Sequence, residues 1–176
     1  MKTEHTYKSL PSQMTRVQFL NCFGSVYESS PWIAETAWDL GQIDSKALDS
    51  AEKLSSIFSQ IVDRASDEKK LALLNAHPDL AGKLALAGKL TADSSKEQAG
   101  ADLQNCTKEE FEQFQKLNTN YKEKFGFPFI LAVQGYQRSE ILKIFEKRIK
   151  NSIEEEYKVA LTQVNRIALL RLGRIE

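Results

Sequence analysis

The chain has 176 residues, of which 41% are apolar and 27% charged, a composition typical of globular proteins and not of disordered chains. Lys plus Arg and Asp plus Glu number 24 each, so the formal net charge is zero. This balance argues against broad electrostatic binding of nucleic acid or of an anionic membrane surface. A chain of this length can bury roughly 70% of its unfolded surface, so it needs neither a disulfide nor a metal to fold. We therefore expect one domain over residues 1–176.

The ends of the chain and its cysteines carry no targeting or disulfide signal. Residues 1–10 lack the apolar run of a signal peptide, and no stretch approaches roughly 18 consecutive apolar residues. Cys22 and Cys106 lie far apart, without metal-ligand spacing, and we expect them to be half-buried, reduced thiols. These features predict a cytoplasmic protein that binds no membrane and no nucleic acid.

The first half of the chain reads as a series of helices. Residues 1–12 precede the first helical signal, and we expect them to form a mobile N-terminal arm. Thr15 and Gln18 have the spacing of a capping box and open a helix, and Pro31 suits the first turn of the next. Asp44 can cap a long third helix, which carries apolar residues at three- and four-residue steps: Leu48, Ala51, Leu54, Ile57, Phe58 and Ile61.

A fourth helix is expected to begin at Ser66, which is followed by two acidic residues in the first turn. Pro78 disfavours helical backbone at the residue before it, so this helix should end at His77. The His77 ring would then be presented at a helix C-terminus rather than packed on a helix face.

The second half continues the helical pattern. Two further capping boxes open helices at Thr107 and Ser152, and a helix between them is expected over residues 139–149. Residues 125–133 are strongly apolar but broken by Gly126 and Pro128, so we expect a buried segment that is not regular helix throughout. Its backbone groups would then need partners, and a bound polar ligand is one possible partner. No segment alternates like a strand, and the prediction is an all-α, single-domain bundle of about eight helices.

His77 is the first candidate for chemistry. The chain has two histidines, and His5 lies in the expected arm. A lone histidine is structural more often than catalytic, but the turn at Pro78 favours a functional role for His77. No second histidine, cysteine pair or glutamate lies at ligand spacing around it, so we predict no metal site.

Two further candidates have structural and functional interpretations. Ser94 and Glu97 form a capping box, which by itself explains both residues. The same helix N-terminus also suits an anionic ligand, and the two interpretations are not exclusive. Arg171, near the C-terminal end of the last predicted helix, is best explained locally as a solvated or dipole-compensating charge, with contact to a substrate carboxylate as the alternative.

Several motifs in fixed order resemble one known family. They occupy residues 75–82, 94–101, 117–121 and 124–130, with further matches at residues 23–28, at Pro31 and Trp32, at Arg148 and Asn151, and at Arg171 and Leu172. Together they are similar to the 2-oxo-4-hydroxy-4-carboxy-5-ureidoimidazoline (OHCU) decarboxylases of urate breakdown. The resemblance extends over residues 15–172.

The resemblance implies an all-α homodimer that converts OHCU to (S)-allantoin and CO₂ without a cofactor. His77 matches the catalytic histidine, and Glu97 matches a carboxylate close to the reacting centre. The implied substrate contacts are Pro78, Ser94, Ser95, Lys96, Glu97, Gln98, Phe129, Ile130, Leu131, Ala132, Val133 and Arg171. The chemistry is consistent, because electrons left by the departing carboxylate can flow into a C=N bond of the substrate itself, so no cofactor is needed as an electron sink.

Three other functions remain open from the sequence. The chain could be a helical binding module that keeps the pocket without turnover, or a lyase acting on a different ureido or imidazoline acid. A scaffold protein without a ligand is the third. A binding module would show no turnover, a related lyase would prefer another acid in a substrate panel, and a scaffold protein would show no ligand-dependent shift in melting temperature.

Overall fold

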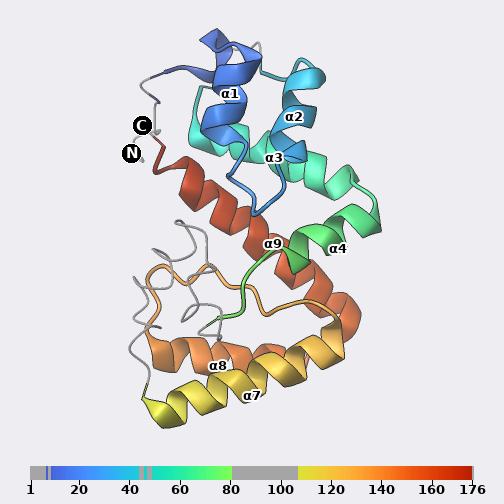
Figure 1. Ribbon diagram of the computed structural model, residues 1–176, viewed down its shortest axis with the longest axis vertical. Helices are drawn as coiled ribbons and strands as arrows, with labels where there is room; N and C mark the ends of the chain where they lie inside the picture. The colour runs from blue at the N-terminus through green and yellow to red at the C-terminus, as the bar shows by residue number, and fades with distance from the viewer. Residues whose placement is uncertain (1–6, 8, 44–45, 47–48, 81–106, 176) are drawn as a thin grey trace. The chain divides into compact units, whose positions relative to one another are not determined.

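The computed structural model describes residues 7, 9–43, 46, 49–80 and 107–175. Within these residues the chain forms seven α-helices, one short 3-10 helix and no β-strand, which confirms the prediction of an all-α fold (Figure 1). The chain divides into two compact units, one made of residues 1–76 and 164–176 and the other of residues 77–163. No described helix is both long enough and apolar enough to cross a membrane.

The first unit is built on an aromatic core between short helices. Helix α1 packs on α2, and α2 packs on α3 (Figure 1). Phe19 lies at the centre of the core, with its ring centroid 4.9 Å from that of Phe23 and 6.4 Å from that of Phe58. Cys22, by contrast, is exposed, so the expectation of a half-buried thiol is wrong there; Cys106 lies outside the described residues. The elements are η1 (Pro11–Gln13), α1 (Arg16–Phe23), α2 (Trp32–Asp39), α3 (Ala51–Arg64) and α4 (Asp67–Asn75).

Most helix starts in this unit follow the sequence signals. The Thr15 hydroxyl accepts from the backbone N–H of Gln18, whose side chain returns to the Thr15 backbone, and this completes the predicted capping box. Pro31 directly precedes α2, and the Ser66 hydroxyl caps α4. These signals succeed because each acts within one turn of the helix that it starts.

The predicted start of α3 is wrong. The helix begins at Ala51, and its cap is the Ser50 hydroxyl, which accepts from the Lys53 N–H at 3.4 Å. The preceding Asp49 uses its carboxylate elsewhere, accepting from the Ser12 N–H at 2.8 Å and from the Ser12 hydroxyl at 2.7 Å. Asp44, which the sequence favoured as the cap, lies outside the described residues.

The second unit contains α7 (Lys108–Phe125), α8 (Arg138–Arg148) and the first part of α9 (Ile153–Leu172), which continues into the first unit. Helices α7 and α8 pack together (Figure 1). The capping boxes predicted at Thr107 and Ser152 are both formed. Helix α8 agrees with the predicted 139–149 to within one residue at each end.

Gly126 ends α7 in the left-handed conformation, with φ of 78°, and turns the chain into the apolar segment that follows. A Cβ built at this position meets nothing within 4 Å, so backbone strain is the only penalty for a side chain. We expect Gly126→Ala to destabilise the protein by about 1 kcal/mol in urea unfolding, and Gly126→Asn by less, because asparagine tolerates this conformation better. Equal losses for the two variants would contradict this explanation.

Candidate active site

The segment that carries His77 leaves the end of α4 and enters the second unit. Helix α4 ends at Asn75, two residues before the predicted end, with Ala76 as its C-cap. His77 has only 8% of its surface exposed. The expectation that the ring is presented rather than packed is therefore wrong, because tertiary contacts bury the segment.

Helix α7 contacts the residues that follow His77. The Asn118 side-chain amide donates to the Leu80 carbonyl at 2.7 Å, and the Lys122 ammonium lies 3.6 Å from the Asp79 carboxylate. Asn118 is 5% exposed, and its buried Oδ1 has no hydrogen-bond partner among the described residues. Asn118 belongs to the motif at residues 117–121 but was not predicted to be a site residue, although an asparagine on the otherwise apolar face of Phe114, Tyr121 and Phe125 was a usable signal.

The second predicted segment follows Gly126. Residues 127–133 are all buried and non-helical, which confirms the prediction for this segment. Side chains of the protein satisfy part of its backbone: Arg148 donates to the Ile130 carbonyl at 2.7 Å, and the Ala132 N–H donates to Gln163 at 3.1 Å. The Val133 carbonyl accepts from the Tyr136 N–H at 3.0 Å.

Other backbone donors of this segment remain available. The N–H groups of Leu131 and Val133 donate no hydrogen bond to any residue that the structure describes. A buried, unpaired N–H is costly, and protein segments rarely leave one without a partner. Oxygen atoms of a bound ligand would satisfy these donors, as expected of a site that receives a carbonyl or carboxylate.

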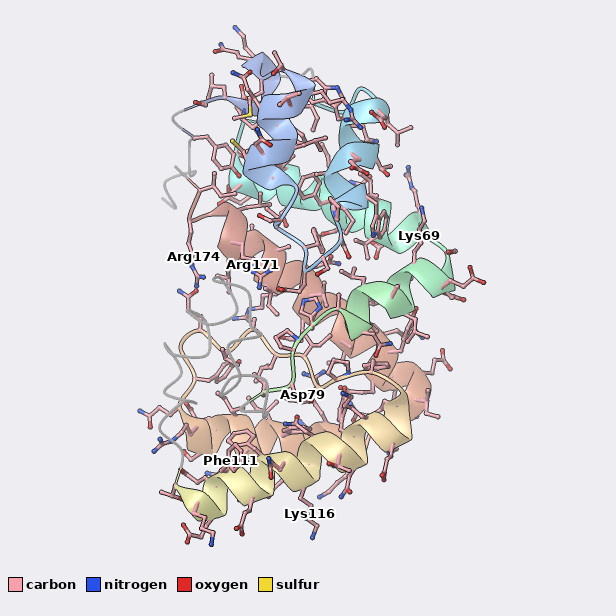
Figure 2. All side chains as sticks on the ribbon, in the orientation of Figure 1. Lys69, Asp79, Phe111, Lys116, Arg171 and Arg174 are labelled. Carbon is pink, nitrogen blue, oxygen red and sulfur yellow. The ribbon has the colours of Figure 1, made fainter. Side chains whose placement is uncertain are left out.

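Arg171 lies in the first unit, near the end of α9 (Figure 2). It is 5% exposed, donates to the Val26 carbonyl at 3.2 Å and forms an ion pair with Glu28 at 3.1 Å. The interpretation of Arg171 as a solvated charge is therefore wrong, although the residue does lie in the last turn of α9. The sequence could not indicate this pair, because its members are 143 residues apart.

The remaining predicted site residues lie outside the described part of the chain, namely Ser94, Ser95, Lys96, Glu97 and Gln98. Among the described residues, no group of three or more histidine, cysteine, aspartate or glutamate side chains is arranged to hold a metal ion. His77, Pro78 and Phe129–Val133 thus belong to the second unit, and Arg171 to the first.

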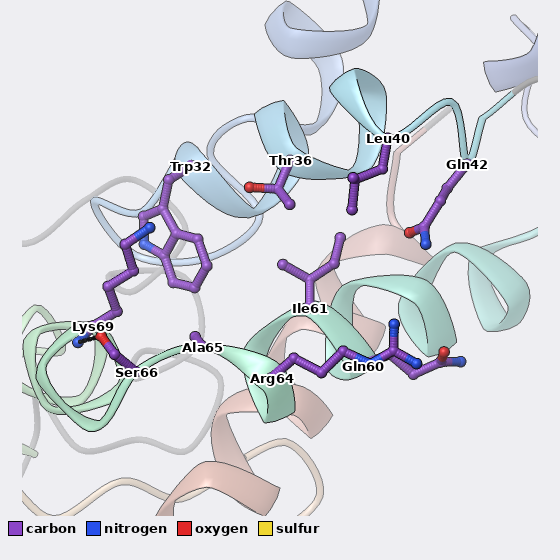
Figure 3. A pocket seen from close by; sticks show the side chains of 10 residues that line it. All are labelled: Trp32, Thr36, Leu40, Gln42, Gln60, Ile61, Arg64, Ala65, Ser66 and Lys69. Atoms are coloured by element: carbon purple, nitrogen blue, oxygen red, sulfur yellow. Dashed lines mark hydrogen bonds between the residues drawn. The ribbon is translucent and has the colours of Figure 1, made fainter.

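A cavity of about 330 Å³ lies in the first unit and contains none of the predicted site residues (Figure 3). Its wall includes Trp32, Arg64 and Lys69, with the Lys69 ammonium 5.0 Å from the centre of the Trp32 ring. No histidine or carboxylate lines it, so it offers no group suited to proton transfer near neutral pH. The candidate site therefore centres on His77 and not on this cavity.

Comparison with known proteins decides the family. The family model for OHCU decarboxylase matches residues 12–173. The chain belongs to the OHCU decarboxylase family. It is 40% identical over 155 residues to the OHCU decarboxylase of Haloferax volcanii, covering 88% of this chain and 87% of that protein. The corresponding protein of Halalkalicoccus jeotgali is 38% identical over 164 residues, covering 93% of this chain and 88% of its own length.

A solved structure agrees with the family assignment. The crystal structure of an (S)-allantoin synthase matches 92% of this chain with a TM-score of 0.73 and 31% sequence identity. The chain covers 51% of that structure's chain. The family model spans nearly all of the present sequence, so the family's characteristic region includes both units.

Proposed function

We propose that this protein converts OHCU to (S)-allantoin and CO₂ in urate degradation, without a cofactor, and that His77 is its catalytic acid and base. The observation that carries the proposal is family membership over residues 12–173, together with the position of a buried histidine where the resemblance assigns the catalytic one. The names of the relatives and of the solved (S)-allantoin synthase support the same substrate and product.

The reaction breaks the bond between C4 and the carboxylate carbon. The bonding electrons move into the adjacent C=N bond as CO₂ leaves. A proton is then delivered to one face of the bound intermediate, which sets the configuration of the product. His77 assists proton transfer at the 4-hydroxyl group and during reprotonation. The apolar residues of 127–133 exclude water and favour uncharged CO₂ over the bound carboxylate. The N–H groups of Leu131 and Val133, which donate to no described residue, orient the substrate.

Glu97 is proposed to orient the imidazole or to contact the substrate, and Gln98 to hold the ring and ureido groups. Ser94, Ser95 and Lys96 complete this stretch. Glu97→Gln separates chemistry from helix capping: loss of turnover with an unchanged melting temperature identifies a catalytic carboxylate, whereas a lower melting temperature with normal turnover identifies a cap. Both quantities are measured on the same preparation.

Arg171 is proposed to contact the substrate, with its charge already compensated by Glu28. It would then act as an oriented hydrogen-bond donor rather than as an isolated positive charge. The proposal further includes a homodimeric assembly and a cytoplasmic location.

The test of this function is a substrate panel. OHCU is generated from urate in situ, and CO₂ release is compared with that from other ureido and imidazoline acids. We expect turnover of OHCU to exceed that of every other acid. Preference for another acid would instead identify a related lyase. If allantoin raises the melting temperature but the protein shows no turnover, the protein is a binding module. If it shows neither turnover nor a shift in melting temperature, a scaffold protein is favoured.

A further inference from the structure

We infer that Arg148 is a positioning residue, which fixes the substrate-facing segment Phe129–Val133 through a buried ion pair with Glu156. The inference rests on the proposed function, because that function assigns the segment to substrate. All the contacts that carry it lie within residues 77–163, one compact unit.

Arg148 uses each nitrogen of its guanidinium group. Nε donates to Glu156 Oε1 at 2.9 Å, and Nη2 donates to the same oxygen at 2.5 Å. The third nitrogen, Nη1, donates to the Ile130 carbonyl at 2.7 Å. The side chains of Arg148 and Glu156 are 8% and 0% exposed, so the geometry is set by the protein and not by solvent. One side chain thus links helices α8 and α9 to the backbone of the segment.

The same guanidinium group restrains the neighbouring side chain of the segment. The carbon at the centre of the Arg148 guanidinium lies 4.5 Å from the centre of the Phe129 ring. Phe129 stacks on Phe145, with centroids 3.8 Å apart and planes 13° apart, and contacts the edge of Tyr121 at 5.4 Å. Two consecutive residues of the segment, Phe129 and Ile130, are therefore held by Arg148, one through its ring and the other through its carbonyl.

Glu156 is held in turn by neutral donors. The Tyr121 hydroxyl donates to Oε1, and the Asn151 amide donates to Oε2 at 2.7 Å. Burial, together with the nearby carboxylate, raises the pKa of the Tyr121 phenol, so the hydroxyl keeps its proton. Oε1 alone accepts from Arg148, and the Tyr121 hydroxyl holds this oxygen in place, whereas Asn151 bonds only Oε2.

Stability alone is a weak explanation for this arrangement. Well-packed apolar residues of similar volume are often as stabilising as a buried ion pair, because both charges lose their hydration. What an apolar pair cannot supply is a donor for the Ile130 carbonyl, which lies in a segment that is neither helix nor strand and so has no hydrogen-bond ladder of its own. The geometry therefore points to a role in setting the backbone position of the site, where a displacement of about 1 Å can cost about 100-fold in rate.

The test compares Arg148→Lys with Asn151→Ala. Lysine keeps the charge but has only one side-chain nitrogen. It therefore cannot make two bonds to Glu156, one bond to the Ile130 carbonyl and the contact with the Phe129 ring at the same time. Asn151→Ala removes a hydrogen bond to Glu156 and leaves the link to Ile130 intact. We expect Arg148→Lys to lower kcat about 10- to 100-fold with a smaller change in KM, and to accelerate amide hydrogen exchange in residues 129–133. Asn151→Ala should keep kcat within about twofold at temperatures where both variants are folded.

The outcomes separate this inference from the proposed function. If the wild type is active and Arg148→Lys changes neither kcat nor the amide hydrogen exchange of residues 129–133, the positioning role alone is overturned. Equal falls in kcat for both variants also overturn it, because they indicate general destabilisation. Inactive wild type overturns the proposed function. In that case the exchange rates still decide whether Arg148 orders the segment, since they require no substrate.

Discussion

Replacing His77 with alanine is expected to lower the rate of OHCU decarboxylation about 10²- to 10⁴-fold, the usual contribution of a positioned acid–base group. The other described residues proposed to contact the substrate, Pro78, Phe129–Val133 and Arg171, offer no side chain that exchanges protons near neutral pH. Initial rates of OHCU loss, corrected for spontaneous decay, give the measurement. A variant that retains more than one tenth of the wild-type rate would show that another residue carries the proton.

The control for His77→Ala uses the second histidine. His5→Ala removes the same side chain from the predicted N-terminal arm, and its rate should equal that of the wild type. Because His77 is buried, alanine also leaves a cavity, and His77→Asn provides a variant with less lost volume. Both His77 variants should be inactive although their melting temperatures differ, which separates the lost proton carrier from lost packing.

Replacing Glu156 with glutamine should destabilise the protein by about 3–5 kcal/mol, because it leaves the buried Arg148 charge without its partner. Urea unfolding followed by far-ultraviolet circular dichroism measures the loss. Two comparisons define its origin. Lys158→Gln removes an exposed ion pair to Glu154 and should change stability little. The double replacement Arg148→Met with Glu156→Leu should recover part of the loss, since no charge is then left unpaired.

A loss for Glu156→Gln no greater than that for Lys158→Gln would mean that water or a neighbouring group compensates Arg148. A double variant less stable than Glu156→Gln would show that the pair contributes net stability beyond apolar packing. The ion pair would then stabilise the fold in addition to positioning the segment.

Helix positions were predictable where the determining contacts are local. Thr15, Thr107 and Ser152 act on backbone three residues away, and all three start helices as expected. The start of α3 was missed because Asp44 and Ser50 are both acceptable caps by local rules. The true start is accompanied by the long-range contact of Asp49 with Ser12, 37 residues away.

The site was predictable as a set of residues but not as an arrangement. The apolar run broken by Gly126 and Pro128 indicated a buried, irregular segment, and the structure has one. The burial of His77, the pairing of Arg171 with Glu28 and the link from Arg148 to Ile130 were not predictable. Each depends on residues 18 or more positions apart or on helix packing, which periodicity does not encode. Glu97 and its neighbours lie outside the described residues, so their predicted roles stay predictions.

The most direct test of the central claim is the chirality of the product. OHCU is formed from urate by urate oxidase and hydroxyisourate hydrolase, and circular dichroism follows the solution after addition of this protein. We predict rapid formation of optically active allantoin of S configuration, because the proton is delivered to one face of a bound intermediate. Slow decay to racemic allantoin, at the rate observed without the protein, would contradict the assignment of this chain as an OHCU decarboxylase.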